Sequence, residues 1–143
     1  GTYSDELFDY NGNMHSKSHL HLEGLDVFNF ALHRVPQSIQ ETLNAAKKSI
    51  SDVDYLVLHQ ANGLITKTLA RKLDVPLARC LTSIEQFGNT SSASIPLTMA
   101  CHGDELYGRK DLSLILSGFG VGFSWASLFL STEFPKTKLI TYA

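Results

Sequence analysis

The chain has 143 residues, a length that fits one globular domain. Its composition, 43% hydrophobic and 18% charged, excludes the disordered and fibrous classes of protein. Twelve Lys and Arg against fourteen Asp and Glu give a net charge of −2, which disfavours a nucleic-acid partner. The sequence has no apolar run near the roughly 20 residues that span a bilayer, no signal-peptide pattern and only two cysteines, so we expect a cytoplasmic, reduced protein without a membrane span.

The first third of the chain predicts an irregular leading segment followed by a strand and a long helix. Residues 1–18 are polar and turn-rich, whereas the polar and apolar residues of 19–22 alternate as in a short strand. From Phe28 to Ile50, apolar residues recur at intervals of three and four, which predicts an amphipathic helix. Pro36 lies inside this pattern, and we expect a kink or break there.

The middle of the chain alternates strands and helices. Residues 55–58 form a continuous apolar run, typical of a strand buried on both faces. The helical spacing of apolar residues over 62–73 predicts a second helix, which ends at the Asp74-Val75-Pro76 segment. Residues 80–86 predict a third strand.

The last third predicts a helix and two final strands. Asn89-Thr90-Ser91-Ser92 has helix-capping chemistry and opens a helix to about Cys101. Residues 112–116 and 123–130 predict two strands, joined by a tight turn that contains Gly118, Gly120 and Gly122. The whole pattern indicates an α/β fold, with a layered mixed sheet of about five strands and helices packed on it, in one domain over 19–143.

Two polar residues follow predicted strands, and we expect them to lie near each other. His59 ends one strand and Asn89 ends another, and in such a sheet these ends share one edge. An imidazole and a carboxamide can both donate hydrogen bonds to one oxygen and stabilise an enolate or oxyanion. The glycine turn can bring a backbone amide close to the same ligand.

Each of these features also has a structural interpretation. His59 could be a surface or capping residue, and Asn89 could simply cap its helix. The Gly118–Gly122 segment resembles a dinucleotide loop superficially, but a strand follows it instead of a helix, so we exclude a nicotinamide site.

The remaining histidines and cysteines do not predict a metal or redox site. His19 and His21 would share one face of a strand, and His15 is near them, but no cysteine or carboxylate stands at ligand spacing. Cys80 and Cys101 lack redox or zinc spacing and are typical of small buried residues. We expect no metal site.

Three segments of the chain resemble a known family. The sequence that precedes them, Leu22-Glu23-Gly24-Leu25-Asp26-Val27-Phe28, resembles the same family. The three segments are Leu58-His59-Gln60-Ala61-Asn62, Phe87-Gly88-Asn89-Thr90-Ser91-Ser92-Ala93-Ser94-Ile95-Pro96 and Gly118-Phe119-Gly120-Val121-Gly122-Phe123-Ser124-Trp125. In this order they resemble the C-terminal half of a β-ketoacyl-acyl-carrier-protein synthase III, a condensing enzyme of the thiolase superfamily. The resemblance runs from about Leu20 to Leu130.

The resemblance implies a decarboxylative condensation without a cofactor. In this family a cysteine on the other half of the chain takes an acyl group from acyl-CoA, and malonyl-acyl-carrier-protein then loses CO2 and attacks it. By the matching motifs, His59 and Asn89 would donate hydrogen bonds to the malonyl thioester oxygen. The Gly120–Val121 backbone would form the acyl oxyanion hole, with Val121 as the donor, and Asn62 and Phe119 would contact substrate.

The sequence also departs from the family pattern. Neither cysteine lies in the family's nucleophile motif, so we expect the N-terminal half to supply it and this fragment alone to be inactive. Leu64 replaces an arginine that several members use to dock the carrier protein. Lys67 and Arg71 could supply positive charge instead, or form a solvated helix face.

The resemblance further implies acyl carrier protein, acyl-CoA and the N-terminal half as partners, and a homodimer. Two alternatives remain open at this point. One is a related acyltransferase of the superfamily that makes an ester, an amide or a quinolone-type product. The other is a non-catalytic domain for dimerisation or carrier-protein binding.

Overall fold

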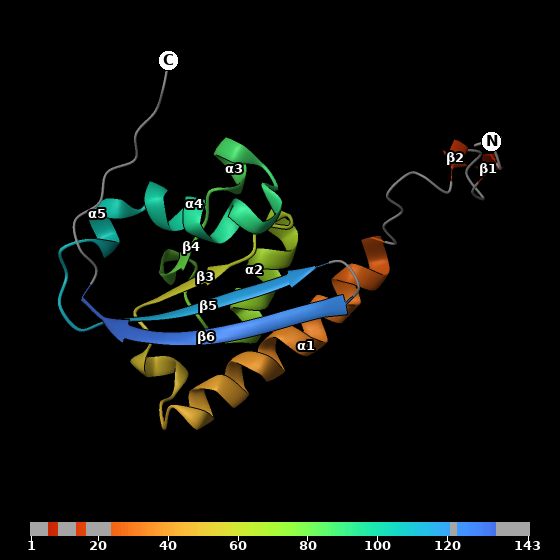
Figure 1. Cartoon of the computed structure of the whole chain (residues 1–143). Helices are drawn as coiled ribbons and strands as arrows, with labels where there is room; N and C mark the ends of the chain where they lie inside the picture. The colour runs from red at the N-terminus through yellow and green to blue at the C-terminus, as the bar shows by residue number, and fades with distance from the viewer. Residues whose placement is uncertain (1–5, 9–13, 17–23, 121–122, 134–143) are drawn as a thin grey trace, which may run out of the picture.

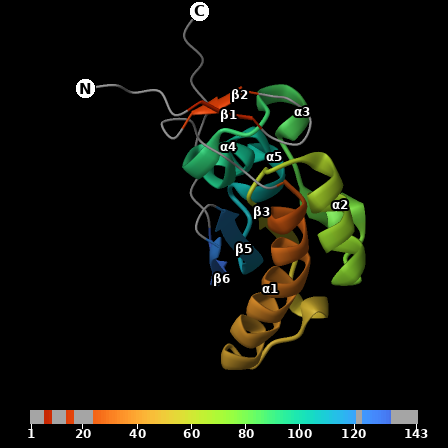
Figure 2. The same cartoon turned by 90° about the vertical axis from the view of Figure 1, so that its right-hand side faces the viewer.

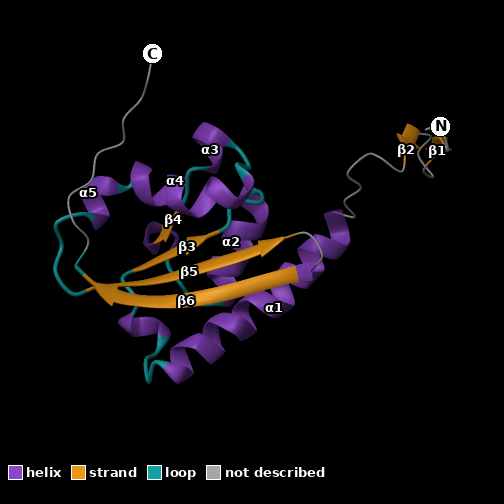
Figure 3. Ribbon diagram, viewed as in Figure 1, coloured by secondary structure: helices purple, strands orange, loops and turns teal. Residues whose placement is uncertain are grey.

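A computed structural model of the chain describes residues 6–8, 14–16, 24–120 and 123–133 (Figure 1). Its centre is a four-stranded sheet in the order β4-β3-β5-β6. The strands are β3 (Tyr55–Leu58), β4 (Cys80–Leu81), β5 (Leu112–Gly120) and β6 (Ser124–Thr132). β3 pairs in parallel with β4 and β5, whereas β5 and β6 are antiparallel, so the expected mixed sheet is confirmed (Figure 3).

One face of the sheet carries two amphipathic helices, α1 (Gly24–Ala45) and α2 (Gly63–Lys72). They pack together with β3 and β5 in one apolar cluster, and Figure 2 shows the two helices next to each other. The buried residues of α1 lie four apart, as an apolar helix stripe requires; they are Ala31, Val35, Ile39 and Leu43.

Pro36 lies inside α1 and does not break it, so the break expected as one possibility at this residue is absent. A proline lacks the backbone N–H that would bond to the carbonyl four residues earlier, here that of Leu32. The Nζ atom of Lys72, on α2, donates to this Leu32 carbonyl oxygen at 2.7 Å. A tertiary hydrogen bond therefore replaces the helical one, and α1 runs continuously from Gly24 to Ala45.

The other face carries α4 (Ser94–Cys101) and the one-turn helices α3 (Ile84–Phe87) and α5 (Gly103–Leu106). Its buried apolar cluster is smaller and contains Val57, Leu81, Leu106, Leu112 and Leu114. Buried polar side chains accompany it, namely Gln60, Ser83, Ser94 and Thr98. Short 3-10 helices η1 (Ile50–Asp52), η2 (Leu77–Arg79) and η3 (Ser91–Ala93) connect the elements.

The strand expected over 80–86 is wrong beyond Leu81. Thr82 and Ser83 leave the sheet because both bond to the buried Gln60 side chain: Thr82 Oγ1 donates to its Oε1 at 2.8 Å and the Ser83 amide at 3.2 Å. The chain then turns into α3. β4 is therefore short but remains in the sheet, which has four strands among the described residues. The fifth expected strand, at 19–22, lies outside the described residues.

Within the segment 1–18, expected to be irregular, β1 (Glu6–Phe8) and β2 (Met14–Ser16) pair antiparallel, with Leu7 opposite His15. The Asn11-Gly12 dipeptide between them is a hairpin signal that the irregular interpretation did not use. None of the helices in the described part of the chain is both long and apolar enough to cross a membrane.

Candidate active site

His59 is held at the carboxyl end of β3 by two hydrogen bonds and one aromatic contact. Its backbone N–H donates to the Ser117 carbonyl at 2.8 Å, which extends the β3–β5 pairing by one residue. Its ring atom Nδ1 lies 2.6 Å from Ser94 Oγ on α4. The Phe119 ring, from β5, packs edge-on against the imidazole with centroids 5.3 Å apart. The sequence thus places one histidine where strand, neighbouring strand and helix meet.

The surroundings of His59 favour a neutral imidazole. Burial lowers the pKa of His59 below its ordinary value, because a charged ring would lose solvation, and the Ser91 carbonyl offsets part of this effect. At neutral pH the ring therefore carries one proton, and one of its nitrogens is a donor.

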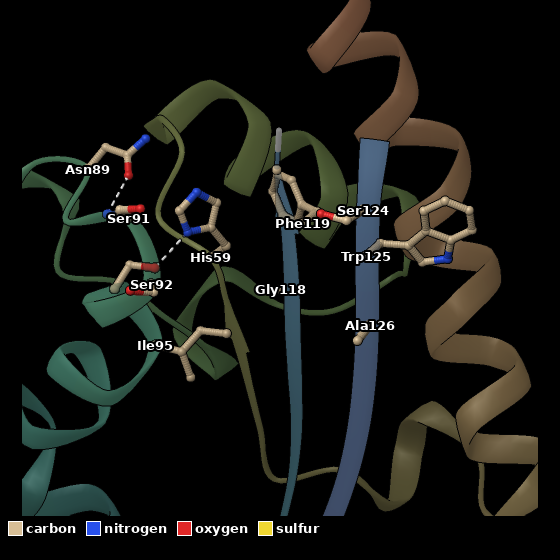
Figure 4. A pocket seen from close by; sticks show the side chains of 12 residues that line it. His59, Asn89, Ser91, Ser92, Ile95, Gly118, Phe119, Ser124, Trp125 and Ala126 are labelled. Carbon is tan, nitrogen blue, oxygen red and sulfur yellow. Dashed lines mark hydrogen bonds between the residues drawn. The ribbon is translucent and has the colours of Figure 1, made fainter. Parts of the chain in front are cut away.

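Asn89 follows α3 in a loop with unusual backbone geometry. Gly88, which ends α3, has φ 65° and ψ −154°, a conformation open essentially to glycine alone. Ser91 has a positive φ of 54°, and its amide donates to Asn89 Oδ1 at 2.9 Å. Because the oxygen of the Asn89 carboxamide is taken by this bond, its NH2 group is left as the free donor. Figure 4 shows the Asn89 oxygen turned toward Ser91 and the nitrogen turned away from it.

One pocket of about 650 Å³ brings the predicted donors together. His59, Asn89, Phe119 and Gly120 all line it, although His59 and Asn89 are thirty positions apart in sequence. Among the lining residues Figure 4 also shows Ile95, Gly118 and Ala126 below His59. A Cβ atom at Gly118 would lie 3.9 Å from Ile95 Cδ1, an ordinary contact distance. Val121, the expected oxyanion-hole donor, lies outside the described residues.

This arrangement can stabilise negative charge on an oxygen. His59 and Asn89 line the same pocket, and a neutral imidazole N–H and a carboxamide NH2 are both donors without a formal charge of their own. Donors that are held in place before the charge develops lower the energy of an enolate or oxyanion.

The other predicted binding residues do not line this pocket. Asn62 caps α2, because its Oδ1 accepts from the Ile65 amide at 2.8 Å. Lys67 lines a separate cavity of about 300 Å³ near Cys80, and Arg71 is exposed on α2.

Neither cysteine belongs to the pocket. Burial raises the pKa of the Cys80 thiol to about 11 and also raises that of Cys101, so both stay protonated at neutral pH. No group of three or more metal-ligating side chains lies together in the part of the chain that the structure describes.

Sequence reasoning missed Ser94 and Ser91 as site residues. Ser91 lies in the Asn89–Ser92 run, which was expected to cap a helix, and both serines lie in the Phe87–Pro96 motif, in which only Asn89 was given a role. The signal available was their position: a serine in the first turn of a helix that starts beside a strand end can reach that strand's last side chain.

Comparison with known proteins agrees with this geometry. Residues 43–132 match the family described as 3-Oxoacyl-[acyl-carrier-protein (ACP)] synthase III C terminal. The chain is 38% identical over 118 residues to a Beta-ketoacyl-[acyl-carrier-protein] synthase III of Porphyra umbilicalis, covering 80% of the chain and 35% of the relative. The enzyme of that name in Lactococcus lactis is 35% identical over 132 residues, covering 91% and 41%.

Solved structures are similar to the same extent. A crystal structure of a 3-oxoacyl-(acyl-carrier-protein) synthase III aligns with a TM-score of 0.83 and 32% identity, over 90% of this chain and 38% of that one. One from Burkholderia xenovorans LB400 aligns with a TM-score of 0.75 and 39% identity, over 80% and 33%. The chain thus spans between a third and about two fifths of the length of these relatives.

Proposed function

The chain belongs to the family of 3-oxoacyl-[acyl-carrier-protein] synthase III C-terminal domains, and from this premise we propose that it supplies the hydrogen-bond donors of a condensing active site. The reaction is the decarboxylative Claisen condensation of acyl-CoA with malonyl-acyl-carrier-protein, in fatty acid biosynthesis. The nucleophilic cysteine belongs to an N-terminal half outside this chain, because both thiols described above are protonated and lie away from the pocket.

The donors act when the malonyl group loses CO2. The bond between the malonyl carboxylate and the α-carbon breaks, and its electron pair passes into an enolate whose oxygen is the former thioester carbonyl. His59 and Asn89 donate hydrogen bonds to this oxygen. The enolate carbon then attacks the acyl thioester, a carbon–carbon bond forms, and the cysteine thiolate leaves. The backbone around Gly120 and Val121 stabilises the oxyanion of that second step.

One observation carries the proposal: His59 and Asn89 line a single pocket, and the Oδ1 atom of Asn89 is occupied by the Ser91 amide. The bond from the Ser91 amide uses only the Oδ1 atom of Asn89 and leaves its NH2 group as a donor in a residue that lines the pocket. The edge-on Phe119 ring beside His59 adds an apolar wall, which suits a site where CO2 forms.

We also propose acyl carrier protein and acyl-CoA as partners, in a cytoplasmic homodimer. The exposed cations Lys67 and Arg71 on α2 would attract the acidic carrier protein. Leu64, 66% exposed on the same helix, would contribute an apolar contact.

The test uses the native polypeptide that contains this sequence. Its intact mass should exceed 15.8 kDa, with one reactive cysteine upstream. It should release CO2 from malonyl-acyl-carrier-protein and form a 3-oxoacyl product when acyl-CoA is present. His59→Ala should lower decarboxylation by about 10² to 10³ while acyl transfer from acyl-CoA to the cysteine continues.

The same assay separates the alternatives. An ester, amide or quinolone-type product in place of the 3-oxoacyl product would identify a related acyltransferase. A native protein of 15.8 kDa that releases no CO2 would contradict the proposal and favour a binding domain.

A further inference from the structure

We propose that Ser94 is a positioning residue for His59: its hydroxyl donates to Nδ1 and holds the imidazole as the tautomer whose proton is on Nε2. This inference rests on the proposed function, since it assigns which ring nitrogen serves as the donor. The contact is short, at 2.6 Å, and the Ser94 side chain is only 1% exposed.

The direction of the bond follows from the single proton of the hydroxyl. Ser94 Oγ has no second hydrogen-bond partner among the residues that the structure describes. If Nδ1 were the donor, the buried hydroxyl proton of Ser94 would have no acceptor, which is costly away from water. If Ser94 donates, both atoms are satisfied and the proton of the neutral ring belongs to Nε2. The Ser91 carbonyl offsets part of the lowering of the His59 pKa by stabilising the charged ring, in which both nitrogens carry protons.

A buried chain of hydrogen bonds fixes Ser94 relative to β3. The Thr98 hydroxyl donates to the Ser94 carbonyl at 2.7 Å, so the Ser83 hydroxyl, 2.7 Å from Thr98 Oγ1, must be the donor of that pair. The Ser83 amide donates to Gln60 Oε1, and Gln60 Nε2 donates to the Leu58 carbonyl at 2.8 Å. The chain therefore returns to the residues on both sides of His59 in sequence, and Ser94 cannot shift independently of the ring.

The orientation that results suits two donors at one oxygen. Figure 4 shows the hydrogen bond at Nδ1 on the side of the His59 ring that faces α4. The second ring nitrogen lies on the side of Asn89. Ser94 thus acts on His59 as the Ser91 amide acts on Asn89, because each occupies the acceptor atom of a pocket-lining residue and leaves its donor nitrogen for a ligand.

The first test measures the tautomer directly, without substrate. In the native polypeptide labelled with ¹⁵N-histidine, with the His59 signals assigned by a His59→Gln variant, Nδ1 should give the shift of an unprotonated nitrogen and Nε2 that of a protonated one. Ser94→Ala should convert this into a mixture of tautomers. A protonated Nδ1 in the wild type would overturn the inference even if the protein proves to be a condensing enzyme.

The second test compares rates. Ser94→Ala should lower the rate of malonyl decarboxylation on the order of tenfold and leave acyl transfer from acyl-CoA unchanged, whereas Ser94→Thr keeps the hydroxyl and should recover most of the rate. Ser127→Ala is the matched control, because it removes a serine hydroxyl bonded to Ser38 and Ser117 away from the pocket. Equal decarboxylation in Ser94→Ala and the control would refute the role of Ser94.

The two tests also separate the two proposals. A wild type that releases no CO2 refutes the proposed function, and the tautomer measurement then still decides the direction of the Ser94 bond. Melting temperatures of all variants identify any loss of rate that comes from unfolding.

Discussion

The two faces of the sheet are built from different interactions. On the α1–α2 face the main cluster has fourteen buried apolar residues, from Ala31 to Phe119, among those that the structure describes. The corresponding cluster on the α4–α5 face has five, and a buried chain of hydrogen bonds through Gln60, Ser83, Thr98 and Ser94 lies beside it. His59 contacts α4 through Ser94, so the pocket depends on the polar face.

The difference indicates a division of labour. Apolar contacts are non-directional and stabilise the fold in proportion to the area buried, but they fix a side chain's orientation poorly. Hydrogen bonds contribute less net stability each, yet they fix donor and acceptor atoms in direction. The α1–α2 face should therefore govern stability, and the α4–α5 face should govern the geometry of the site.

The largest expected effect is on the apolar face. Ile39→Ala removes a fully buried side chain from α1 and leaves a cavity, so the free energy of unfolding should fall by about 2–5 kcal/mol. Denaturant unfolding of the native polypeptide measures this change, and the decarboxylation rate per folded molecule should not move. His33→Ala, exposed on the same helix, should change stability by less than about 0.5 kcal/mol. A large loss of rate in folded Ile39→Ala would break the distinction between the faces.

Asn89→Asp should lower the decarboxylation rate without changing the free energy of unfolding. The carboxylate oxygen can still accept from the Ser91 amide, but the donating NH2 group is gone and a negative charge faces the pocket. We expect decarboxylation to fall by about 10² with unfolding unchanged within about 0.5 kcal/mol. Retention of the wild-type rate would mean that Asn89 only holds the loop through its bond with the Ser91 amide.

Thr98→Val tests the polar face itself. The substitution keeps the shape of the side chain, but it removes the donor to the Ser94 carbonyl and the acceptor for Ser83. The free energy of unfolding should fall by about 1–3 kcal/mol, and decarboxylation should slow because Ser94 is no longer fixed.

Thr68→Val is the matched control for this change. Thr68 makes the same type of bond to the carbonyl four residues earlier, that of Leu64, but on the exposed side of α2. Its effect on stability should stay within about 0.5 kcal/mol and its effect on rate should be nil. If both valine variants behaved alike, burial of the Thr98 hydroxyl would have no special importance.

The smallest effect concerns the contact between α1 and α2. Lys72→Met removes the donor to the Leu32 carbonyl and should cost about 1 kcal/mol in unfolding free energy. In a Pro36→Ala background the same carbonyl regains its helical donor, so Lys72→Met should then cost almost nothing. A double-mutant cycle measures this coupling, and strictly additive effects would contradict the compensation described above.

Much of the architecture could be predicted because it is encoded in local patterns. The apolar run of 55–58 and the helical spacing over 62–73 correspond to β3 and α2 within a residue or two. His59 and Asn89 do line one pocket, as expected, but only His59 follows directly from a strand end. Because β4 ends at Leu81, helix α3 and the turn at Gly88 bring Asn89 to this side of the sheet.

The failures share a physical cause, which is a partner distant in sequence. Residues 82–83 leave their strand because of Gln60, and Pro36 is tolerated because of Lys72. The role of Ser94 depends on a ring thirty-five positions away and on the direction of a hydroxyl proton. No local pattern contains this information, because it arises only when the layers pack.

Gly118 gives the pocket a property that is useful for enzyme engineering. Its absent side chain would meet Ile95 at ordinary contact distance, so the strand accepts an alanine there without a change of backbone. The neighbouring Ala126 already shows a one-carbon side chain in the pocket wall. Gly118 is therefore a place where the volume of the pocket can be reduced by one methyl without a change of the strand.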